Sequence, residues 1–186
     1  IVYGYILYRD IFGANTKFSE NEVYVYIPTD ATYDEVKNIV APYIKDMSRF
    51  EMVATKKSYP ERSDKSGRFL LKKGMNSNEI VNSLRLNVPV NLAFNNQERL
   101  ENFAGRIGSQ IEADSLSLLD AFRDKKFLEE NGFTEENVLS MFVPNSYEFF
   151  WNTSAVKFRD RMAKEYRKFW TNDRLEKAKQ LNLTPI

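Results

Sequence analysis

Three similar units begin within residues 19–94. Each unit consists of a strand-like run, a polar turn and an amphipathic helix. In the first unit, the β-branched and aromatic run at residues 23–27 predicts a strand. Thr32 and Glu35 then have the spacing of a capping box, in which the threonine oxygen accepts an orphan amide and the glutamate reaches back. Apolar residues at helical spacing follow, so this unit predicts a fold that mixes strands and helices.

The second and third units repeat this pattern. Residues 68–71 form the second strand-like run, after which Asn76 and Glu79 repeat the cap spacing. Residues 88–94 form the third run, and Asn95 is placed to begin a helix that has a glutamate at its third position. Because the helices are short and the strands few, we expect an α+β fold rather than a large parallel sheet. The helices should pack on one side of a two- or three-stranded sheet.

The pattern from residue 95 onward is mainly helical, whereas residues 58–67, between the first two units, are polar and predict an exposed loop. Pro144 interrupts an aromatic-rich stretch and favours an extended backbone just before it. The predicted helical segments are residues 114–122, residues 125–131 closed by Gly132, a short turn at 134–140, a long helix from Thr153 or Ser154 to Trp170, and a last helix capped by Thr171.

The chain of 186 residues contains no histidine and no cysteine. These absences exclude Ser-His-Asp triads, thiol nucleophiles and most zinc sites from the chain. With 27 Lys and Arg against 26 Asp and Glu, the net charge is +1, so we expect no nucleic-acid partner. Any chemistry within the chain has to use Asp, Glu, Lys, Tyr or Ser.

The first eight residues are apolar and are followed by Arg9 and Asp10. Eight residues are too few to span a bilayer, which needs about 20. They are either the outer end of a longer membrane anchor, with tyrosines at the interface, or a buried N-terminal strand or helix turn. The residues alone leave both interpretations open.

Two segments carry a resemblance to a known family. In residues 66–84, a Gly-x-aromatic strand leads through a Lys-x-Gly-Met turn into a helix. Residues 141–154 read Met-Phe-Val-Pro-Asn-Ser-Tyr-Glu-Phe-Phe-Trp-Asn-Thr-Ser, which resembles the Phe-x-Pro-(Asp/Asn)-(Thr/Ser)-Tyr motif of MltG/YceG-like proteins. The aromatic extension of this motif is similar to the Bacteroidetes branch of that family. The resemblance runs from about residue 10 to the end and is most specific between Pro144 and Trp151.

The resemblance implies a membrane-anchored endolytic murein transglycosylase that cleaves glycan strands between MurNAc and GlcNAc and leaves a 1,6-anhydro end. It implies a bacterial inner-membrane protein with one N-terminal anchor, with this region in the periplasm and no cofactor. The corresponding segments would be a membrane-proximal stem at 1–18, a LysM-like subdomain at 19–94 and a partial, mainly helical catalytic subdomain at 95–186. The family's catalytic glutamate follows the Leu-Thr-Pro-like segment, so we expect it beyond Ile186 and expect this fragment to be inactive alone.

The resemblance also points to residues that could contact glycan. Asn145 and Tyr147 carry the motif and either bind the sugar or brace the catalytic helix. Glu148 lies between two aromatic residues, which could raise its pKa if it lined a cleft, but an exposed glutamate on an aromatic strand is the simpler interpretation. The other candidates are Trp151, and Lys73 and Asn76 in the turn of the LysM-like subdomain, which could instead be a mere spacer.

Two alternatives to a transglycosylase remain from the sequence. The chain could be a non-catalytic peptidoglycan-binding or scaffold module that partners peptidoglycan synthases such as penicillin-binding proteins. The family is also often labelled aminodeoxychorismate lyase, an activity that needs pyridoxal phosphate in a larger two-domain fold. Nothing in the sequence presents such a fold.

Overall fold

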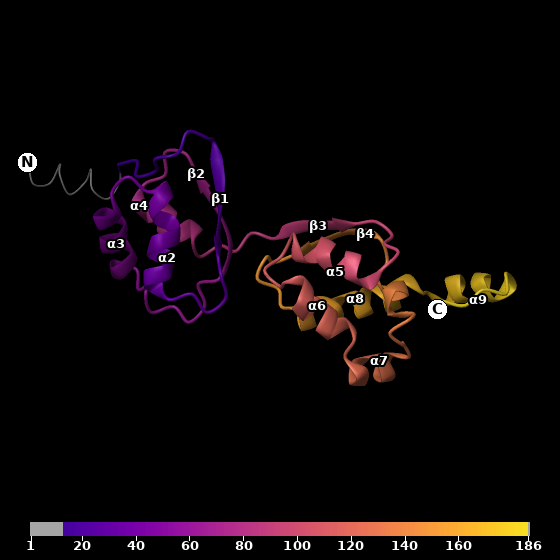
Figure 1. Cartoon of the computed structure of the whole chain (residues 1–186). Coiled ribbons are helices and arrows are strands. Elements are labelled where there is room, and N and C mark those ends of the chain that lie inside the picture. The colour runs from indigo at the N-terminus through magenta and orange to yellow at the C-terminus, as the bar shows by residue number, and fades with distance from the viewer. Residues whose placement is uncertain (1–12, 186) are drawn as a thin grey trace, which may run out of the picture. The chain divides into compact units, whose positions relative to one another are not determined.

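The computed structural model describes residues 13–185 and shows an α+β protein (Figure 1). The described chain forms two compact units. The first unit consists of residues 13–89 and 150–152, and the second unit consists of residues 90–149 and 153–185. The expected membrane-proximal segment lies largely in residues 1–12, outside the described part of the chain. Within the described part, no helix has the length and apolar character needed to cross a membrane.

The first unit is built on an antiparallel pair of strands, β1 and β2, in which Tyr24 lies opposite Leu70. Along β1, Val25 and Ile27 are buried while Tyr24 and Tyr26 are exposed, so one face of the sheet carries the core. The helices between and after the two strands supply the rest of that core. The elements of this unit are β1 (Glu22–Ile27), α2 (Tyr33–Val40), η1 (Ala41–Tyr43), α3 (Met47–Lys56), β2 (Gly67–Lys72) and α4 (Ser77–Ser83).

Both predicted capping boxes in this unit are confirmed. Thr32 Oγ1 accepts the N–H of Glu35, and the glutamate carboxylate accepts the N–H of Thr32 at 2.8 Å. Asn76 and Glu79 make the same reciprocal pair at the start of α4, with both distances 2.9 Å. These side chains satisfy amides that have no partner inside the helix, which is why the sequence located both helix starts.

Helix α3 was not predicted, and the loop after it is not wholly exposed. The helix begins at Asp46, whose carboxylate accepts the N–H of Arg49, and it buries Phe50 and Val53. In the loop that we expected to be exposed, Tyr59 is fully buried. Its side chain belongs to the core of the first unit and so anchors the loop, and burial raises the pKa of Tyr59 to about 12.

The second unit has its own antiparallel strand pair, β3 and β4. Of the two sheet sizes expected, the first unit has the smaller one, with two strands. The strand run expected at residues 88–94 lies instead in a second two-stranded sheet, where β3 pairs with a strand from the aromatic-rich stretch. The elements are β3 (Val90–Phe94), α5 (Leu100–Gly108), α6 (Ser115–Phe122), α7 (Lys125–Asn131), η2 (Val138–Met141), β4 (Asn145–Phe149), α8 (Ala155–Phe169) and α9 (Asn172–Gln180).

The helix expected from Asn95 begins five residues later, at Leu100. Its N-cap is Arg99, whose side chain makes no capping hydrogen bond. The predicted ends of the later helices are confirmed. Ser154 caps α8 and Thr171 caps α9, and Gly132 ends α7 in a left-handed conformation with φ of 74°.

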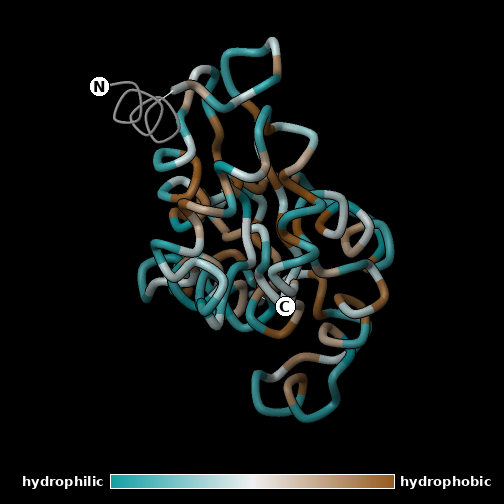
Figure 2. The backbone as a smooth tube through the Cα atoms, turned by 90° about the vertical axis from the view of Figure 1, so that its left-hand side faces the viewer, coloured by the Kyte–Doolittle hydropathy of each residue, from teal (hydrophilic) through white to brown (hydrophobic). Residues whose placement is uncertain are grey.

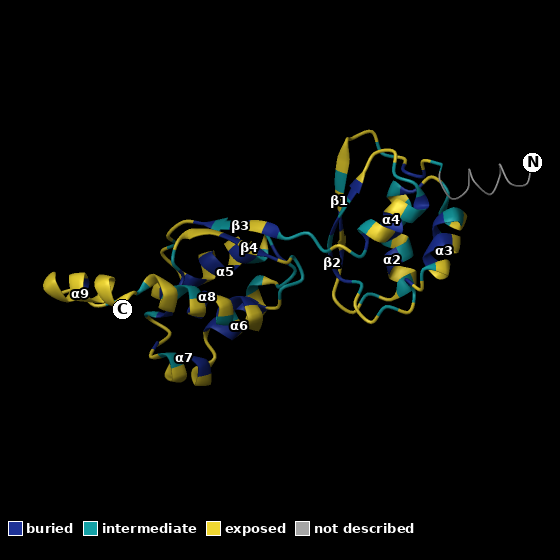
Figure 3. Ribbon diagram, turned by 180° about the vertical axis from the view of Figure 1, so that it is seen from behind, coloured by how far each residue is buried: buried dark blue, intermediate teal, exposed yellow. Residues whose placement is uncertain are grey.

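Phenylalanine rings form the centre of the second unit. The rings of Phe103 and Phe142 have centroids 4.2 Å apart, and those of Phe122 and Phe142 are 4.7 Å apart. Figure 2 colours the backbone by the hydropathy of each residue, and many of the turns at its outline are hydrophilic. Helix α9 buries only Ala178 and is otherwise exposed (Figure 3). The aromatic residues noted in the sequence therefore serve mainly as core.

Candidate functional site

The motif segment at residues 141–154 divides between strand and turn. Residues Asn145–Phe149 form β4, in which Tyr147 and Phe149 are buried while their neighbours are exposed. The next three residues belong to the first unit, and the chain then returns to α8 through the Ser154 cap. The motif therefore places residues of different character on opposite faces of one short strand.

Tyr147 has the geometry of a bracing residue. Its side chain is 8% exposed, and its ring stacks on Phe94 with centroids 5.7 Å apart. Its hydroxyl donates a 2.7 Å hydrogen bond to the carbonyl oxygen of Val143, which fixes the turn before β4. Burial raises the pKa of Tyr147, so its hydroxyl stays neutral and acts as a donor.

Glu148 lies on the opposite, exposed face of β4, directly across from Asn91 in the register. The two aromatic neighbours that suggested a desolvated carboxylate point to the other side of the strand, because adjacent strand residues alternate. Arg161 donates to the backbone oxygen of Glu148 at 3.0 Å. The surroundings of this carboxylate are thus those of a surface residue.

Asn145 lines the larger of two adjoining clefts in the second unit. This larger cleft has a volume of about 700 Å³ and lies beside the ends of β3 and β4. Arg106 from α5 contributes a positive charge, and Ser146 contributes a hydroxyl. Because it is open, polar and bordered by the motif, this cleft can hold an extended hydroxyl-rich ligand.

The smaller cleft, about 320 Å³ in volume, is lined by the loop after β3 and by residues in and around η2. Phe94, Asn95 and Gln97 line both clefts. The sequence interpretation missed these loop residues because it assigned Asn95 to a helix cap. The signal that could have found them is the run Asn95-Asn96-Gln97, three amide side chains directly after a strand.

Trp151 lies in the first unit, where it packs edge-on against Tyr26 with centroids 5.2 Å apart. The residue after it, Asn152, accepts a 3.1 Å hydrogen bond from Asn87 and donates one of 2.7 Å to Ser66. These contacts hold the turn at residues 150–152 in place. Trp151 therefore has Tyr26 as a packing partner, and it remains partly exposed.

Lys73 and Asn76, the candidates in the LysM-like turn, lie near each other in sequence but have different roles in the structure. Lys73 is exposed, and its ammonium donates to the backbone oxygen of Ser19 at 3.2 Å. The side-chain oxygen of Asn76 is used by the cap of α4. Between them, the N–H of Gly74 donates to Thr16 Oγ1 at 2.8 Å. These bonds stabilise the turn itself.

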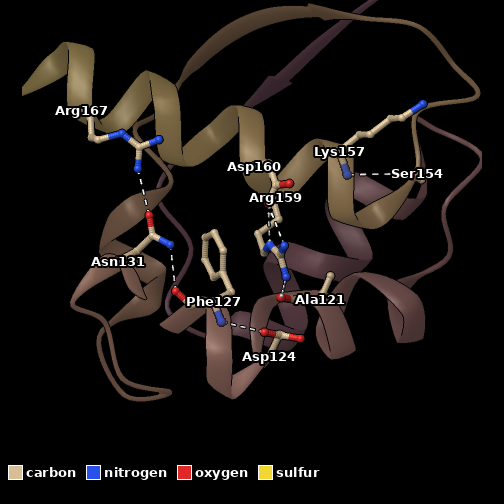
Figure 4. A network of polar contacts seen from close by, with 9 residues as sticks. All are labelled: Ala121, Asp124, Phe127, Asn131, Ser154, Lys157, Arg159, Asp160 and Arg167. Carbon is tan, nitrogen blue, oxygen red and sulfur yellow. Dashed lines mark hydrogen bonds and ion pairs between the residues drawn. The ribbon is translucent and has the colours of Figure 1, made fainter. Parts of the chain in front are cut away.

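A charged groove of about 490 Å³ runs between α7 and α8. Its centre is Arg159, which is only 9% exposed and stacks its guanidinium on the Phe127 ring at 4.0 Å (Figure 4). Arg159 also donates to the carbonyl oxygen of Ala121 and to Asp160. A buried cation with these partners ties three helices together.

Hydrogen bonds hold several described carboxyl groups in their charged form. Among residues 13–185, the carboxyl groups whose pKa departs from its ordinary value all shift downward, because hydrogen bonds stabilise their charged form. They are Glu20, Glu35, Asp46, Glu101 and Asp114. Protonating a glycosidic oxygen needs the opposite shift. Residues 13–185 also contain no cluster of three acidic side chains arranged to hold a metal ion.

Comparison with known proteins gives one family. The model of the YceG-like family matches residues 25–186. Among solved structures, the chain is similar to a yceG-like protein from Listeria monocytogenes, with 18% identity and a TM-score of 0.49. The match covers 90% of this chain and 61% of that chain. The search of curated proteins found no match.

Proposed function

This chain belongs to the YceG-like family, and from that premise we propose that it is the glycan-binding part of a lytic transglycosylase. The whole protein would cleave peptidoglycan between MurNAc and GlcNAc and leave a 1,6-anhydro end. We place it at the bacterial inner membrane, with this region in the periplasm and peptidoglycan synthases as neighbours. The observation that carries the proposal is the family match over the stretch that contains the motif and both clefts of the second unit.

The clefts support glycan binding by their chemistry. Neutral sugars are recognised through hydroxyl and amide groups, which need many hydrogen-bond partners. The loop after β3 supplies three consecutive amides, and Asn145 and Ser146 of the motif add an amide and a hydroxyl. In this arrangement Tyr147 holds the motif in shape from beneath, while the acid that protonates the leaving oxygen comes from outside the described residues.

The test is the release of anhydro-muropeptides from sacculi, measured by mass spectrometry. We expect products from the whole protein and none from the 186-residue chain. Products from the chain alone would overturn the assignment of its role. Binding to insoluble peptidoglycan without cleavage by the whole protein would instead support the alternative, a peptidoglycan-binding scaffold.

A further inference from the structure

We propose that the smaller cleft of the second unit is a pocket for the acetamido group of an N-acetylated hexosamine residue. The inference rests on the proposed function only in taking a glycan as the natural ligand. It adds which cleft and which side chains recognise the acetamido group that MurNAc and GlcNAc both carry. The cleft volume of about 320 Å³ is at the lower end for ligand sites, which suits a single sugar residue rather than a whole strand.

The base of the smaller cleft is aromatic but shows little ring surface. Phe94, Phe103 and Phe142 line it and are 7%, 1% and 5% exposed, respectively. Stacking a pyranose needs a whole ring face, which these buried rings do not present. A single methyl group fits the small apolar patch, and burying one contributes about 0.8 kcal/mol. The methyl of an acetamido group is such a group on a sugar.

The rim supplies the two polar groups that an amide needs. Asn137 Oδ1 accepts the N–H of Thr134 at 2.7 Å, so the Asn137 side-chain NH₂ is left as a donor. Gln97 Nε2 donates to Asn95 Oδ1 at 2.8 Å, so Gln97 Oε1 is left as an acceptor. An acetamido group has one carbonyl and one N–H, which match this donor and this acceptor.

The charge of the smaller cleft selects against anionic ligands. Glu136 is the one ionisable residue that lines it. A carboxylate there accepts sugar hydroxyls and repels carboxylates and phosphates. Arg106, the cation of the larger cleft, does not line this one. The smaller cleft therefore takes a neutral N-acetylated residue, and the larger cleft can hold the adjoining part of the strand.

The experiment measures ligand binding by NMR with the 186-residue chain. N,N′-diacetylchitobiose is the probe, and cellobiose, which has the same linkage but no acetamido group, is the matched ligand. We expect saturation transfer to be strongest at the acetamido methyl and to be absent for cellobiose. The Asn137→Asp variant keeps the oxygen that accepts from Thr134 but loses the donor, so it should bind about tenfold more weakly.

Two further variants keep the test decisive. Asn102→Asp makes the same chemical change at an exposed position of α5 outside the cleft and should bind like the parent. Asn96→Ala alters an exposed rim residue and should also weaken binding if Asn137→Asp fails to fold. Equal binding of cellobiose, no binding of the acetylated probe, or unchanged affinity in the rim variants would overturn the pocket. Because the measurement needs no turnover, its result is independent of whether the whole protein cleaves sacculi.

Discussion

Replacing Tyr147 by phenylalanine separates bracing from glycan contact at the motif tyrosine. The change keeps the buried ring and its stack on Phe94, and it removes only the hydroxyl that donates to the Val143 carbonyl. A neutral hydrogen bond within a protein contributes about 0.5–1.5 kcal/mol. Val143 is half-buried, so water can replace part of the lost bond, and we expect a loss of about 1 kcal/mol in the free energy of unfolding. Tyr147→Ala also removes the ring and should cost about 3–5 kcal/mol.

The two tryptophans allow the second unit to be followed by itself. Trp151 belongs to the first unit and Trp170 to the second. In a Trp151→Phe background, the fluorescence of Trp170 reports urea unfolding of the second unit. Tyr26→Phe is the matched control, since Tyr26 is 43% exposed in the first unit and its change should stay within about 0.5 kcal/mol.

Two results would refute the bracing role. Tyr147→Phe could unfold at the same urea concentration as its parent, which would mean that the bond to Val143 contributes nothing. Alternatively, the variant could keep its stability and lose binding to the acetylated disaccharide, which would assign the hydroxyl to the glycan. A loss of stability with binding retained is the expected combination.

Gly67→Ala should destabilise the first unit by on the order of 2 kcal/mol in thermal unfolding, because φ is +138° and a Cβ would lie 2.5 Å from Asn87 Cγ. Arg159→Met should lower the stability of the second unit by about 1–3 kcal/mol, since a buried carbonyl loses its donor. Arg99→Ser should raise stability by about 0.5–1 kcal/mol by capping α5. Hydrogen bonds lower the pKa of Asp114 below 3.8, so its contribution is present above that pH and is lost as pH falls through the folded value. In Asp114→Asn, the free energy of unfolding should therefore depend less on pH in the acid range.

The predictions for Gly67, Arg159 and Arg99 each have a companion variant. Gly74→Ala places a methyl group in open space and should cost less than Gly67→Ala. Arg159→Lys keeps the charge but not the planar fork and should not restore the lost stability. Arg99→Ala lacks a capping oxygen and should give none of the gain expected from serine. Equal effects within any pair would contradict the corresponding contact.

Local signals explain which elements were predictable. Thr32, Asn76 and Thr171 cap their helices with side chains only three residues from the amides they satisfy, so the sequence alone identified them. Helix α3 was missed although its N-cap, Asp46, accepts from the N–H of Arg49 in the same way. Its position follows from burying Phe50 in a core shared with residues far away in the sequence, which no local pattern specifies.

Pairing across long sequence distances was not predictable. Phe94 pairs with Asn145, so β3 finds its partner after four intervening helical elements. The repeated strand–turn–helix pattern left a two- or a three-stranded first sheet open, because the local pattern fits either pairing equally well. The inward side of β4, with Tyr147 and Phe149, decides the outcome because it contributes to the phenylalanine core.

The helix that the sequence predicts to begin at Asn95 begins at Leu100 instead, so the structure departs here from the local sequence preference. Asn95 and the glutamate three residues later have the spacing of a cap, but Asn95 accepts from Gln97 instead, and α5 begins without a side-chain cap at Arg99. Forgoing a cap costs a helix about 1 kcal/mol. In exchange, the loop presents Asn95, Asn96 and Gln97 to the two clefts. Natural sequences depart from locally optimal choices mainly at functional sites, so this departure independently favours the loop as the place where the protein recognises its ligand.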